Sequence, residues 1–510
     1  MTQIARNLIR LDGWDPNWIF NGLTLRQPYN DHHVFEVSVL VPQPEKKAVV
    51  PPSPALQKDA LLNLLGKDIE ITLSAKGKSG ATGTFRGFVD RVTPVWTSKA
   101  CILRITGYSK TIFMDTGPRF RSFYKKPLGD IAQKIAGSYG SQLPKLVLRS
   151  AGNACVFSVQ TQETDYRYLC RLADGYGKLF YYDGQQLYFG DLEKGAGSAL
   201  PLKFGEDLKQ ASLSLNITPL NFSLSAYQLE DSRLETYRCV NEWPHADALV
   251  SGVVQKSGIY PASDIHLVHV IHHQSELRGK AAHLLAKQAH DVVQLSGASD
   301  LPSLKIGSKI SITGTPELLA NGEFIVINVN HSVNNDYSYS NTFWAVPAGF
   351  PFAMRMQNTR NPLCGPLMAI VRDHRDPDKL GRVRVEFIGD PEKTLSPWLR
   401  VLTSYTGFGG MYFQAEPNDE VVVQAEGFDI EKYPFVSGAF FHGKARAEQW
   451  YDADNKKKGF TTEKVAFRID DRTGKLLIEA DEIEFSARKE MLLRGERQLT
   501  LKATRIDLNP

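Results

Sequence analysis

Four histidines lie close together in the sequence, at His266, His269, His272 and His273. Because imidazole is a common zinc ligand, this cluster is the first candidate for a metal site. Residues 265–274 alternate as a strand does, which places His266 and His272 on one face and His269 and His273 on the other. No carboxylate or thiol joins them at a useful spacing. We therefore expect solvated or interface histidines rather than a zinc site.

Three aspartates, Asp373, Asp376 and Asp378, suggest calcium as a second possibility. They lack the glycine and the terminal glutamate of an EF-hand loop. Asp376 and Asp378 flank a proline and precede Gly381, a pattern typical of a tight connection between strands. In such a connection proline fixes φ and the aspartates accept hydrogen bonds from nearby backbone amides. We predict a strand connection here and no metal.

Patterns that support catalysis are missing from the sequence. No G-x-S-x-G, H-E-x-x-H, G-x-x-x-x-G-K-[ST] or G-x-G-x-x-G pattern occurs in a convincing setting. The five cysteines are scattered and form no C-x-x-C pair, which argues against a disulfide scaffold and a zinc finger. We expect Cys170 to pack in a core, since it shares a helical stripe with Tyr166 and Leu169. The chain is predicted to have no catalytic residue, cofactor or metal, and not to be an enzyme.

Bulk composition excludes further classes. Of 510 residues, 60 are Lys or Arg and 56 are Asp or Glu, and a net charge of +4 is too small to indicate a nucleic-acid binder. Arg382 and Arg384 alternate with Val383 and Val385, which favours the outer face of a sheet for the arginines. No apolar run approaches the roughly 20 residues of a membrane helix. The first 20 residues contain no signal peptide, so we expect assembly in the cytoplasm.

The elements that must position these residues are mostly strands. The first 115 residues predict strands and one short helix at 55–65, and residues 200–350 predict strands with one helix at about 277–293. Between them, a stripe that starts at Leu128 indicates a helix that ends near Gly137. A second helix begins after Thr164, which is a good N-cap, and a hairpin turns at Asp183 and Gly184. Residues 347–366 are rich in proline, methionine and asparagine, and we interpret them as a linker.

The C-terminal residues form a repeat in which apolar residues come in pairs two positions apart. The pairs are Leu476 and Ile478, Ile483 and Phe485, Met491 and Leu493, Leu499 and Leu501, and Ile506 and Leu508. The pairs start 7 or 8 residues apart, and polar and charged residues separate them. Because residues i and i+2 of a strand point to the same side, each repeat offers one small apolar face.

Strands this short cannot enclose a core within one chain. At roughly 1.5–3 kcal/mol for each large aliphatic side chain, ten such residues represent at least about 15 kcal/mol of burial. The interpretation that buries them best is an intertwined prism of three identical chains around a common axis. A β-solenoid within one chain and an ordinary surface meander are the alternatives.

Two groups of residues resemble a known family. The segment IVRDHRDPDKLGRVRVEF from Ile370 to Phe387 resembles the start of the OB-fold in VgrG spike proteins and related phage tail needles. The segment ETDYRYLCRL from Glu163 to Leu172, together with residues 177–184, resembles another signature of that family. In chain order, the first signature has the matching positions Glu163, Thr164, Asp165, Tyr166 and Leu169, and the second has Asp376, Asp378, Gly381, Arg382 and Val383.

The resemblance implies a mainly β fold with tandem hub β-barrels, a small α+β insert, an OB-fold neck and an intertwined C-terminal triple-stranded β-helix or prism. The boundaries expected for these parts are a first hub barrel at 1–125, an insert at 126–199, a second hub barrel at 200–355, a neck at 356–445 and a needle at 446–510. It also implies a homotrimeric central spike of a contractile injection machine, which adapts threefold symmetry to a sixfold tube and mechanically punctures the target envelope.

The partners implied by the resemblance are the inner tube protein, baseplate components, a PAAR-type tip protein and effector cargo. Nucleic acid is not among them, and the target membrane is contacted only during injection. The assembled particle would leave the cell by contraction or lysis. The needle is short, and no lysozyme-like insertion follows the OB segment, so hydrolysis of murein is not supported.

Two other functions remain as alternatives: a phage-type tail hub with cell-wall hydrolase activity, and an OB-fold module that binds carbohydrate or nucleic acid. The sequence does not distinguish a type VI secretion system from an extracellular phage-tail-like particle or a phage.

Overall fold

The computed structural model separates the chain into two units, Met1–Ala439 and Phe440–Pro510. The residues that it describes are 8–42, 58–76, 81–97, 101–152, 154–191, 199–228, 232–239, 248–267, 271, 274–314, 322–348, 365–407, 410–425, 430–431 and 434–506. Residues 349–364, most of the predicted linker, lie outside these ranges. No helix within the described ranges is long and apolar enough to span a membrane.

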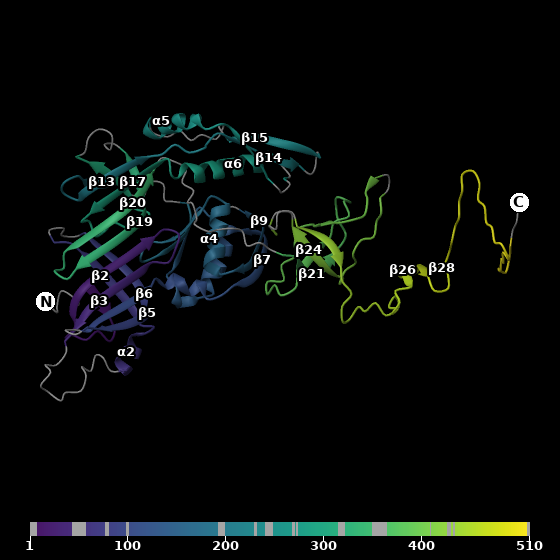
Figure 1. Cartoon of the computed structure of the whole chain (residues 1–510), viewed down its shortest axis with the longest axis horizontal. Coiled ribbons are helices and arrows are strands. Elements are labelled where there is room, and N and C mark those ends of the chain that lie inside the picture. Colours follow the sequence, from purple (N-terminus) through teal and green to yellow (C-terminus); the bar gives the residue numbers. More distant parts are fainter. Residues whose placement is uncertain are drawn as a thin grey trace. The chain divides into compact units, whose positions relative to one another are not determined.

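A 12-stranded sheet forms the centre of the first unit (Figure 1). Ten of its strands follow the order β1-β4-β5-β6-β3-β2-β19-β20-β17-β13, while β18 pairs with β19 and β12 with β18. The bounds of the twelve strands are β1 Ile9–Leu11, β2 Ile19–Pro28, β3 Val34–Val41, β4 Asp68–Ser74, β5 Thr82–Trp96, β6 Cys101–Tyr108, β12 Leu200–Lys203, β13 Leu208–Leu215, β17 Val293–Ser299, β18 Lys309–Thr313, β19 Glu323–Asn334 and β20 Tyr339–Pro347.

The pairing of β2 with β19 joins the two regions predicted as separate barrels. Leu25 lies opposite His331 in this antiparallel pair, so strands from 1–125 and from 200–355 share one sheet. The strands alternate as the sequence predicts: in β3, Phe35 and Val37 are fully buried while Glu36 and Ser38 face the other side. One hydrophobic core packs on the N-terminal half of the sheet and another on the C-terminal half.

The insert between these halves contains two helices and two small sheets. The bounds of its helices and strands are β7 Arg119–Pro127, α3 Leu128–Gly137, β8 Leu146–Arg149, β9 Ala154–Glu163, α4 Asp165–Gly175, β10 Leu179–Tyr182 and β11 Leu187–Gly190. The 3-10 helix η2, Lys110–Asp115, precedes β7, and a second 3-10 helix, η3, Gly140–Gln142, lies between α3 and β8. Both helices begin where the sequence predicts, and β10 and β11 form the predicted hairpin. The strands β7 and β9 form a separate antiparallel pair, and α4 packs on β9 and β10.

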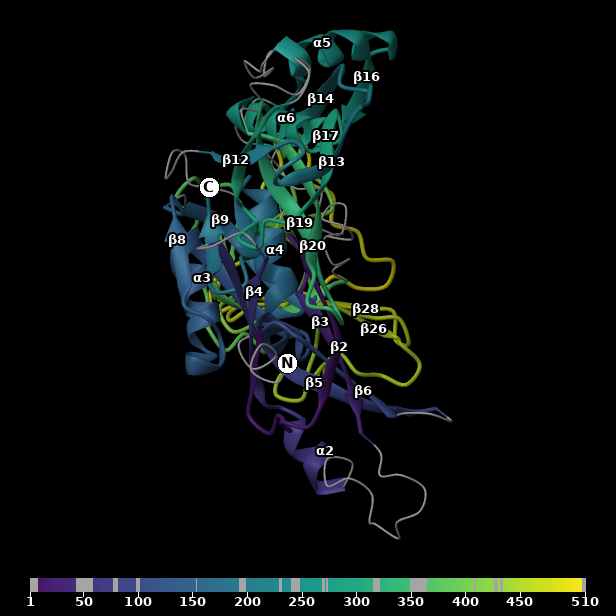
Figure 2. The same ribbon diagram turned by 90° about the vertical axis from the view of Figure 1, so that its left-hand side faces the viewer.

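A further layer lies beside the C-terminal half of the sheet, where Figure 2 shows α5, α6, β14 and β16 grouped together. Its bounds are β14 Phe222–Gln228, β15 Arg233–Arg238, α5 Ala248–Lys256, η5 Ser257–Ile259, β16 Ser263–His266 and α6 Gln274–Ala289. The sequence prediction was wrong in three details. It missed α5, it placed α6 three to four residues too late at both ends, and it extended β16 to Gln274, which instead begins α6.

The last domain of the first unit is a five-stranded sheet in the order β22-β21-β24-β25-β23. The bounds of these strands are β21 Leu367–Asp373, β22 Arg384–Phe387, β23 Arg400–Val401, β24 Glu420–Ala425 and β25 Pro434–Ala439.

Near the N-terminus, the predicted helix at 55–65 is present as α2, Lys58–Leu64, and residues 55–57 lie outside the described ranges.

The second unit contains a three-stranded antiparallel sheet, β26 Lys457–Thr461, β27 Ala466–Asp470 and β28 Lys475–Glu479. Its first apolar pair, Leu476 and Ile478, lies in β28. From Ala480 to Ile506 the described residues form no strand, although the sequence predicts four more short ones. A strand needs the backbone of a neighbouring strand to pair with, and no other described segment of this chain pairs with residues 480–506.

Candidate functional site

The first family signature begins helix α4 and buries charge beside it. The Thr164 hydroxyl accepts a hydrogen bond from the Arg167 backbone amide, as an N-cap residue does. Asp165 is fully buried, and its carboxylate accepts hydrogen bonds from Arg121 at 2.7 Å and from the Tyr139 hydroxyl at 2.7 Å. This carboxylate, paired at the first turn of the helix, fixes the start of α4 against β7.

The apolar side of α4 packs into the core, as predicted. Tyr166, Leu169 and Cys170 are all at most 1% exposed. The ring of Tyr166 lies 4.1 Å from that of His32, whose Nε2 is 2.9 Å from an Asp115 carboxylate oxygen. Burial raises the pKa of Tyr166 well above its usual value, which keeps the phenol neutral. These signature residues stabilise the fold and offer no exposed reactive group.

The second signature forms the predicted connection between β21 and β22. The carboxylate of Asp376 accepts hydrogen bonds from the backbone amides of Asp378, Leu380 and Arg382 at 2.9–3.2 Å. The guanidinium of Arg382 folds back onto the same carboxylate, with Nε at 3.0 Å. Gly381 has a φ of +69°, a conformation that glycine adopts without strain. Arg382 and the backbone amides hold the pKa of Asp376 well below its usual range.

The strand after this connection alternates as expected, but its arginines are not simply solvated. Val383 and Val385 are fully buried, and Arg384 points away from them. The Arg384 guanidinium donates to the Ser396 carbonyl at 2.7 Å and lies 5.4 Å from the centre of the Tyr124 ring, on strand β7. Arg384 therefore lies on the outer face of the strand, as predicted, and contacts an aromatic ring of the insert there.

The histidine cluster gives no site that can be described. His266 ends β16, and its Nδ1 lies 3.1 Å from the Ser225 hydroxyl. His269, His272 and His273 lie outside the described ranges. Among the residues that the structure describes, no group of three or more His, Cys, Asp or Glu side chains is arranged to hold a metal ion.

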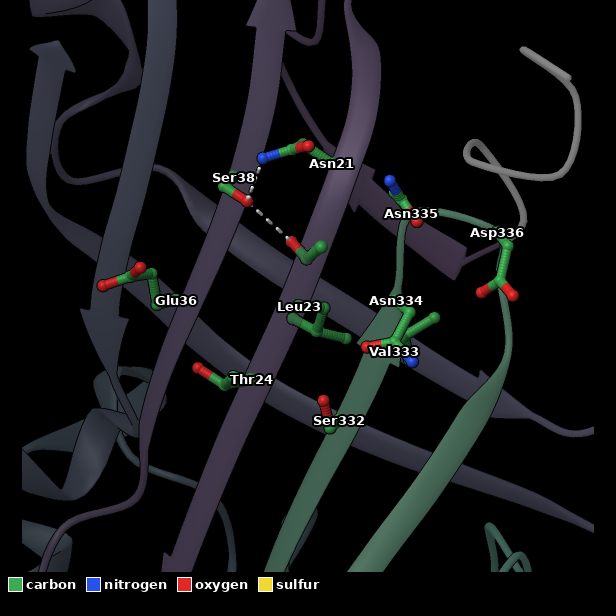
Figure 3. Close-up of a pocket in the computed structure, with 11 residues that line it drawn as sticks. Asn21, Leu23, Thr24, Glu36, Ser38, Ser332, Val333, Asn334, Asn335 and Asp336 are labelled. Carbon is green, nitrogen blue, oxygen red and sulfur yellow. Dashed lines mark hydrogen bonds between the residues drawn. The ribbon is translucent and has the colours of Figure 1, made fainter.

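An open groove of about 410 Å³ crosses strands β3, β2 and β19 on the face away from the core (Figure 3). Its lining is hydroxyl and amide rich, with Asn21, Thr24, Ser38 and Ser332 among its residues. The Asn21 amide donates to the Ser38 hydroxyl at 3.4 Å. This lining resembles a hydrated polar surface and pairs no nucleophile with a base.

The sheet of the second unit presents an apolar face. Phe460 lies opposite Phe467, which in turn lies opposite Ile478, so the three side chains share one face. The rings of Phe460 and Phe467 stack with centres 5.5 Å apart. Ile469 and Leu476 lie opposite each other on the same face. Phe460, Leu476 and Ile478 remain 41%, 56% and 38% exposed.

The apolar pairs beyond this sheet are also exposed. Their described members are all between 46% and 69% exposed: Ile483, Phe485, Met491, Leu493, Leu499, Leu501 and Ile506. Leu508 lies outside the described ranges. Together with the apolar face of the sheet, these side chains form a set that we call the C-terminal ladder. Sequence reasoning found its pairs but missed Phe460 and Phe467, although Phe467 and Ile469 in β27 have the same two-residue spacing, while Phe460 is the one large apolar residue of β26.

Two comparisons with protein families define the chain's class. The model of the phage tail baseplate hub (GPD) family matches residues 48–337, more than half of the chain, and the chain belongs to this family. Residues 367–441 match the type VI secretion system and phage-baseplate injector OB domain. These matches confirm the resemblance to VgrG-type spike proteins that was inferred from the two signatures. A comparison with curated protein sequences gave no match.

Solved structures share the fold at low sequence identity. The E. coli c3393 protein, a component of the type VI secretion system with similarity to the T4 tail proteins gp27 and gp5, is 15% identical, with a TM-score of 0.52 over 85% of this chain and 99% of that one. A chain of the half-lidded Francisella PdpA–VgrG complex is 9% identical, with a TM-score of 0.53 over 93% of this chain and 87% of that one. The corresponding lidded complex gives 10% identity and a TM-score of 0.51, over 91% and 77%. The mainly β hub with an OB domain is thus the shared architecture.

Proposed function

We propose that this protein is the trimeric central spike of a contractile injection machine. Three copies of the hub would match the sixfold tube, and their C-terminal residues would wind into a needle that is driven through a target envelope. The family assignment supports the hub, and the C-terminal ladder carries the proposal of a trimeric needle.

The ladder carries this proposal because its described apolar side chains are left largely exposed by the part of the chain that the structure describes. Phe485 and Leu493 are 69% and 65% exposed, and the repeat places a further pair every 7 or 8 residues. An exposed row of this kind favours association, since each large apolar side chain gains roughly 1.5–3 kcal/mol when it is buried. Three chains are the smallest number that closes such pairs around an axis. The apolar face of the β26–β28 sheet would be the first layer of this arrangement.

Other components follow from the role of a spike. We infer contacts of the hub with an inner tube protein and baseplate components, and of the needle with a PAAR-type tip. Effector cargo is a further partner class that we infer from the role of a spike. The matched Francisella structures show a VgrG in complex with another protein, PdpA, which supports an additional protein partner. The action is mechanical: the sheath supplies the energy, and this protein supplies symmetry matching and stiffness.

Native mass spectrometry of the purified full chain tests the proposal directly. We expect a species of three times the chain mass at micromolar concentration. Electron microscopy of the same sample should resolve a rod formed by the C-terminal residues. A well-folded monomer that persists as concentration is raised would overturn the trimeric needle, and the family assignment of the hub would still stand.

A further inference from the structure

The side chain of Arg171 lies between helix α4 and the OB domain and contacts two carboxylates. It is 8% exposed. Its Nε lies 3.1 Å from both carboxylate oxygens of Glu163, at the end of β9, and its Nη1 lies 2.9 Å from Glu431, in the connection between β24 and β25. Its Nη2 donates to the Val159 carbonyl at 3.0 Å. One guanidinium therefore links β9, α4 and the OB domain.

Residues of the hub also donate hydrogen bonds to the carboxylate of Glu431. Its side chain is 13% exposed, and one carboxylate oxygen accepts from the Val159 amide at 2.9 Å and from the Ser158 hydroxyl. Ser158 in turn accepts a hydrogen bond from the Tyr168 hydroxyl at 2.9 Å. Fully satisfied networks of this kind specify one arrangement of their parts, because any other arrangement leaves a buried charge without partners.

Apolar contacts surround this network and continue the core of the OB domain. Phe157 and Val159, on β9, belong to the same buried cluster as Val385, Phe387 and other residues of the OB domain. The rings of Phe157 and Phe387 stack with centres 6.3 Å apart. The OB domain thus closes its core on β9, and the network lies at the rim of that contact.

The charges in the network depend on one another. Burial disfavours a charged guanidinium, yet the carboxylates of Glu431 and Glu163 raise the pKa of Arg171 above its ordinary value. Burial raises the pKa of Glu163, and Arg171 partly offsets this effect. Removal of the arginine alone would leave two carboxylates facing each other in a site that excludes water, which is costly.

We propose that Glu163, Arg171 and Glu431 form a latch that fixes the orientation of the OB domain on the hub. The latch gives a role to the glutamate and the arginine of the first signature, which the helix cap and the core do not explain. All three residues lie in one chain, so the latch holds whether or not the chain forms a trimer.

Hydrogen–deuterium exchange of the full chain tests the latch, because the Val159 amide donates directly to Glu431. In Glu431→Ala we expect exchange in the β9 peptide to rise at least tenfold, while peptides from β2, β3 and β19 keep their protection. The matched control is Glu392→Ala, which removes a more exposed ion pair, with Lys134, between the same two domains. The control should change exchange in β9 less than twofold.

A second set of variants separates charge from shape. Arg171→Met should raise exchange in β9 as Glu431→Ala does. Combining Arg171→Met with Glu163→Gln and Glu431→Gln should restore most of the protection, because no unpaired buried charge is left. Unchanged exchange in β9 of either single variant would overturn the latch. So would loss of protection throughout the hub sheet, or a Glu392→Ala effect as large as that of Glu431→Ala.

Discussion

The two units of the chain differ in how far their apolar side chains are buried. In the hub, Phe35, Phe85 and Phe343 are completely buried within a single chain. In the second unit, Phe485 is 69% exposed and Leu493 is 65% exposed. Both regions contain apolar residues at two-residue spacing, so the pattern alone does not decide whether a side chain is covered.

This difference in burial depends on whether the same chain supplies neighbouring strands to pair with each strand. The strands of the 12-stranded hub sheet are 3 to 15 residues long and pair with one another, so one face is sealed. The C-terminal pairs lie in segments too short to form a layer over one another. The hub can therefore fold alone, whereas in our proposal the ladder is buried by other chains.

The largest effect is expected from charges placed in the ladder. The double substitution Phe485→Asp and Leu493→Asp should convert the proposed trimer into monomers, because three copies of each carboxylate would have to be buried together without partners. Native mass spectrometry should report a threefold drop in mass, while circular dichroism of the hub stays the same.

The matched control places the same charges between the pairs. Ser486→Asp and Gln498→Asp add the same two negative charges in the polar segments of the repeat, and the trimer should persist. If both double variants lose the trimer alike, net charge rather than the apolar pairs holds the chains together. If neither does, the ladder is not the interface.

A cavity in the hub core should cost stability that the same change in the ladder does not. Phe35→Ala removes a fully buried ring, and we expect it to lower the free energy of unfolding of the hub by about 3–5 kcal/mol. Phe485→Ala should leave the hub's urea midpoint unchanged, since its ring contributes nothing to that core. A shift of the hub midpoint in Phe485→Ala would contradict the independence of the two units.

The sequence predicted elements best where a local signal and the tertiary environment agree. Thr164 caps α4, and the apolar stripe that starts at Leu128 forms α3. Both predictions are confirmed because the apolar face that the sequence indicates for each helix is the face that packs in the core. The connection at Asp376 also followed from sequence, because its hydrogen bonds are almost all within six residues. Such contacts are encoded locally.

Contacts between distant segments could not be predicted in this way. The latch joins Arg171 to Glu431 across 260 positions, and nothing local marks Glu431 as the partner of a buried arginine. The pairing of β2 with β19, which merges the two predicted barrels into one sheet, is equally nonlocal. Helix α5 was missed because its glycine and β-branched residues weaken the helical signal.

Acid should destabilise the hub through two buried histidines. Burial lowers the pKa of His33 and of His331 to about 3 in each case. Both contact Gln27, His331 at 2.8 Å and His33 at 3.1 Å. In the unfolded chain each of these histidines binds a proton below about pH 6.5, whereas in the folded hub the same two histidines stay neutral down to about pH 3. The stabilising effect of these neutral histidines is present above about pH 6.5 and is lost as the pH falls through this window.

The slope of stability against pH measures this effect. Each histidine should contribute about 1.4 kcal/mol per pH unit between pH 6 and 4.5. His331→Gln should reduce the wild-type slope in urea unfolding by about that amount, whatever it does to stability at pH 7. His442→Gln serves as the control, because this residue belongs to the second unit and not to the hub whose unfolding is measured, and the slope of hub unfolding should stay the same. An unaltered slope in His331→Gln would mean that this histidine is protonated in the folded hub.

The smallest effect is expected at the connection between β21 and β22, where order is local and partly exposed. Asp376→Ala removes the acceptor of three backbone amides and of Arg382, and we expect the OB domain to lose about 1–3 kcal/mol of stability. Because the hydrogen bonds to Arg382 and the amides lower the pKa of Asp376, the wild-type advantage should be present above about pH 4 and fade as the pH falls further. Asp373→Ala, whose carboxylate bonds only to Arg375 among the described contacts, is the control and should cost clearly less stability than Asp376→Ala. Equal losses in the two variants would show that the connection is held by its backbone conformation rather than by Asp376, and a loss that reached the hub sheet would remove the contrast between locally encoded and distant contacts.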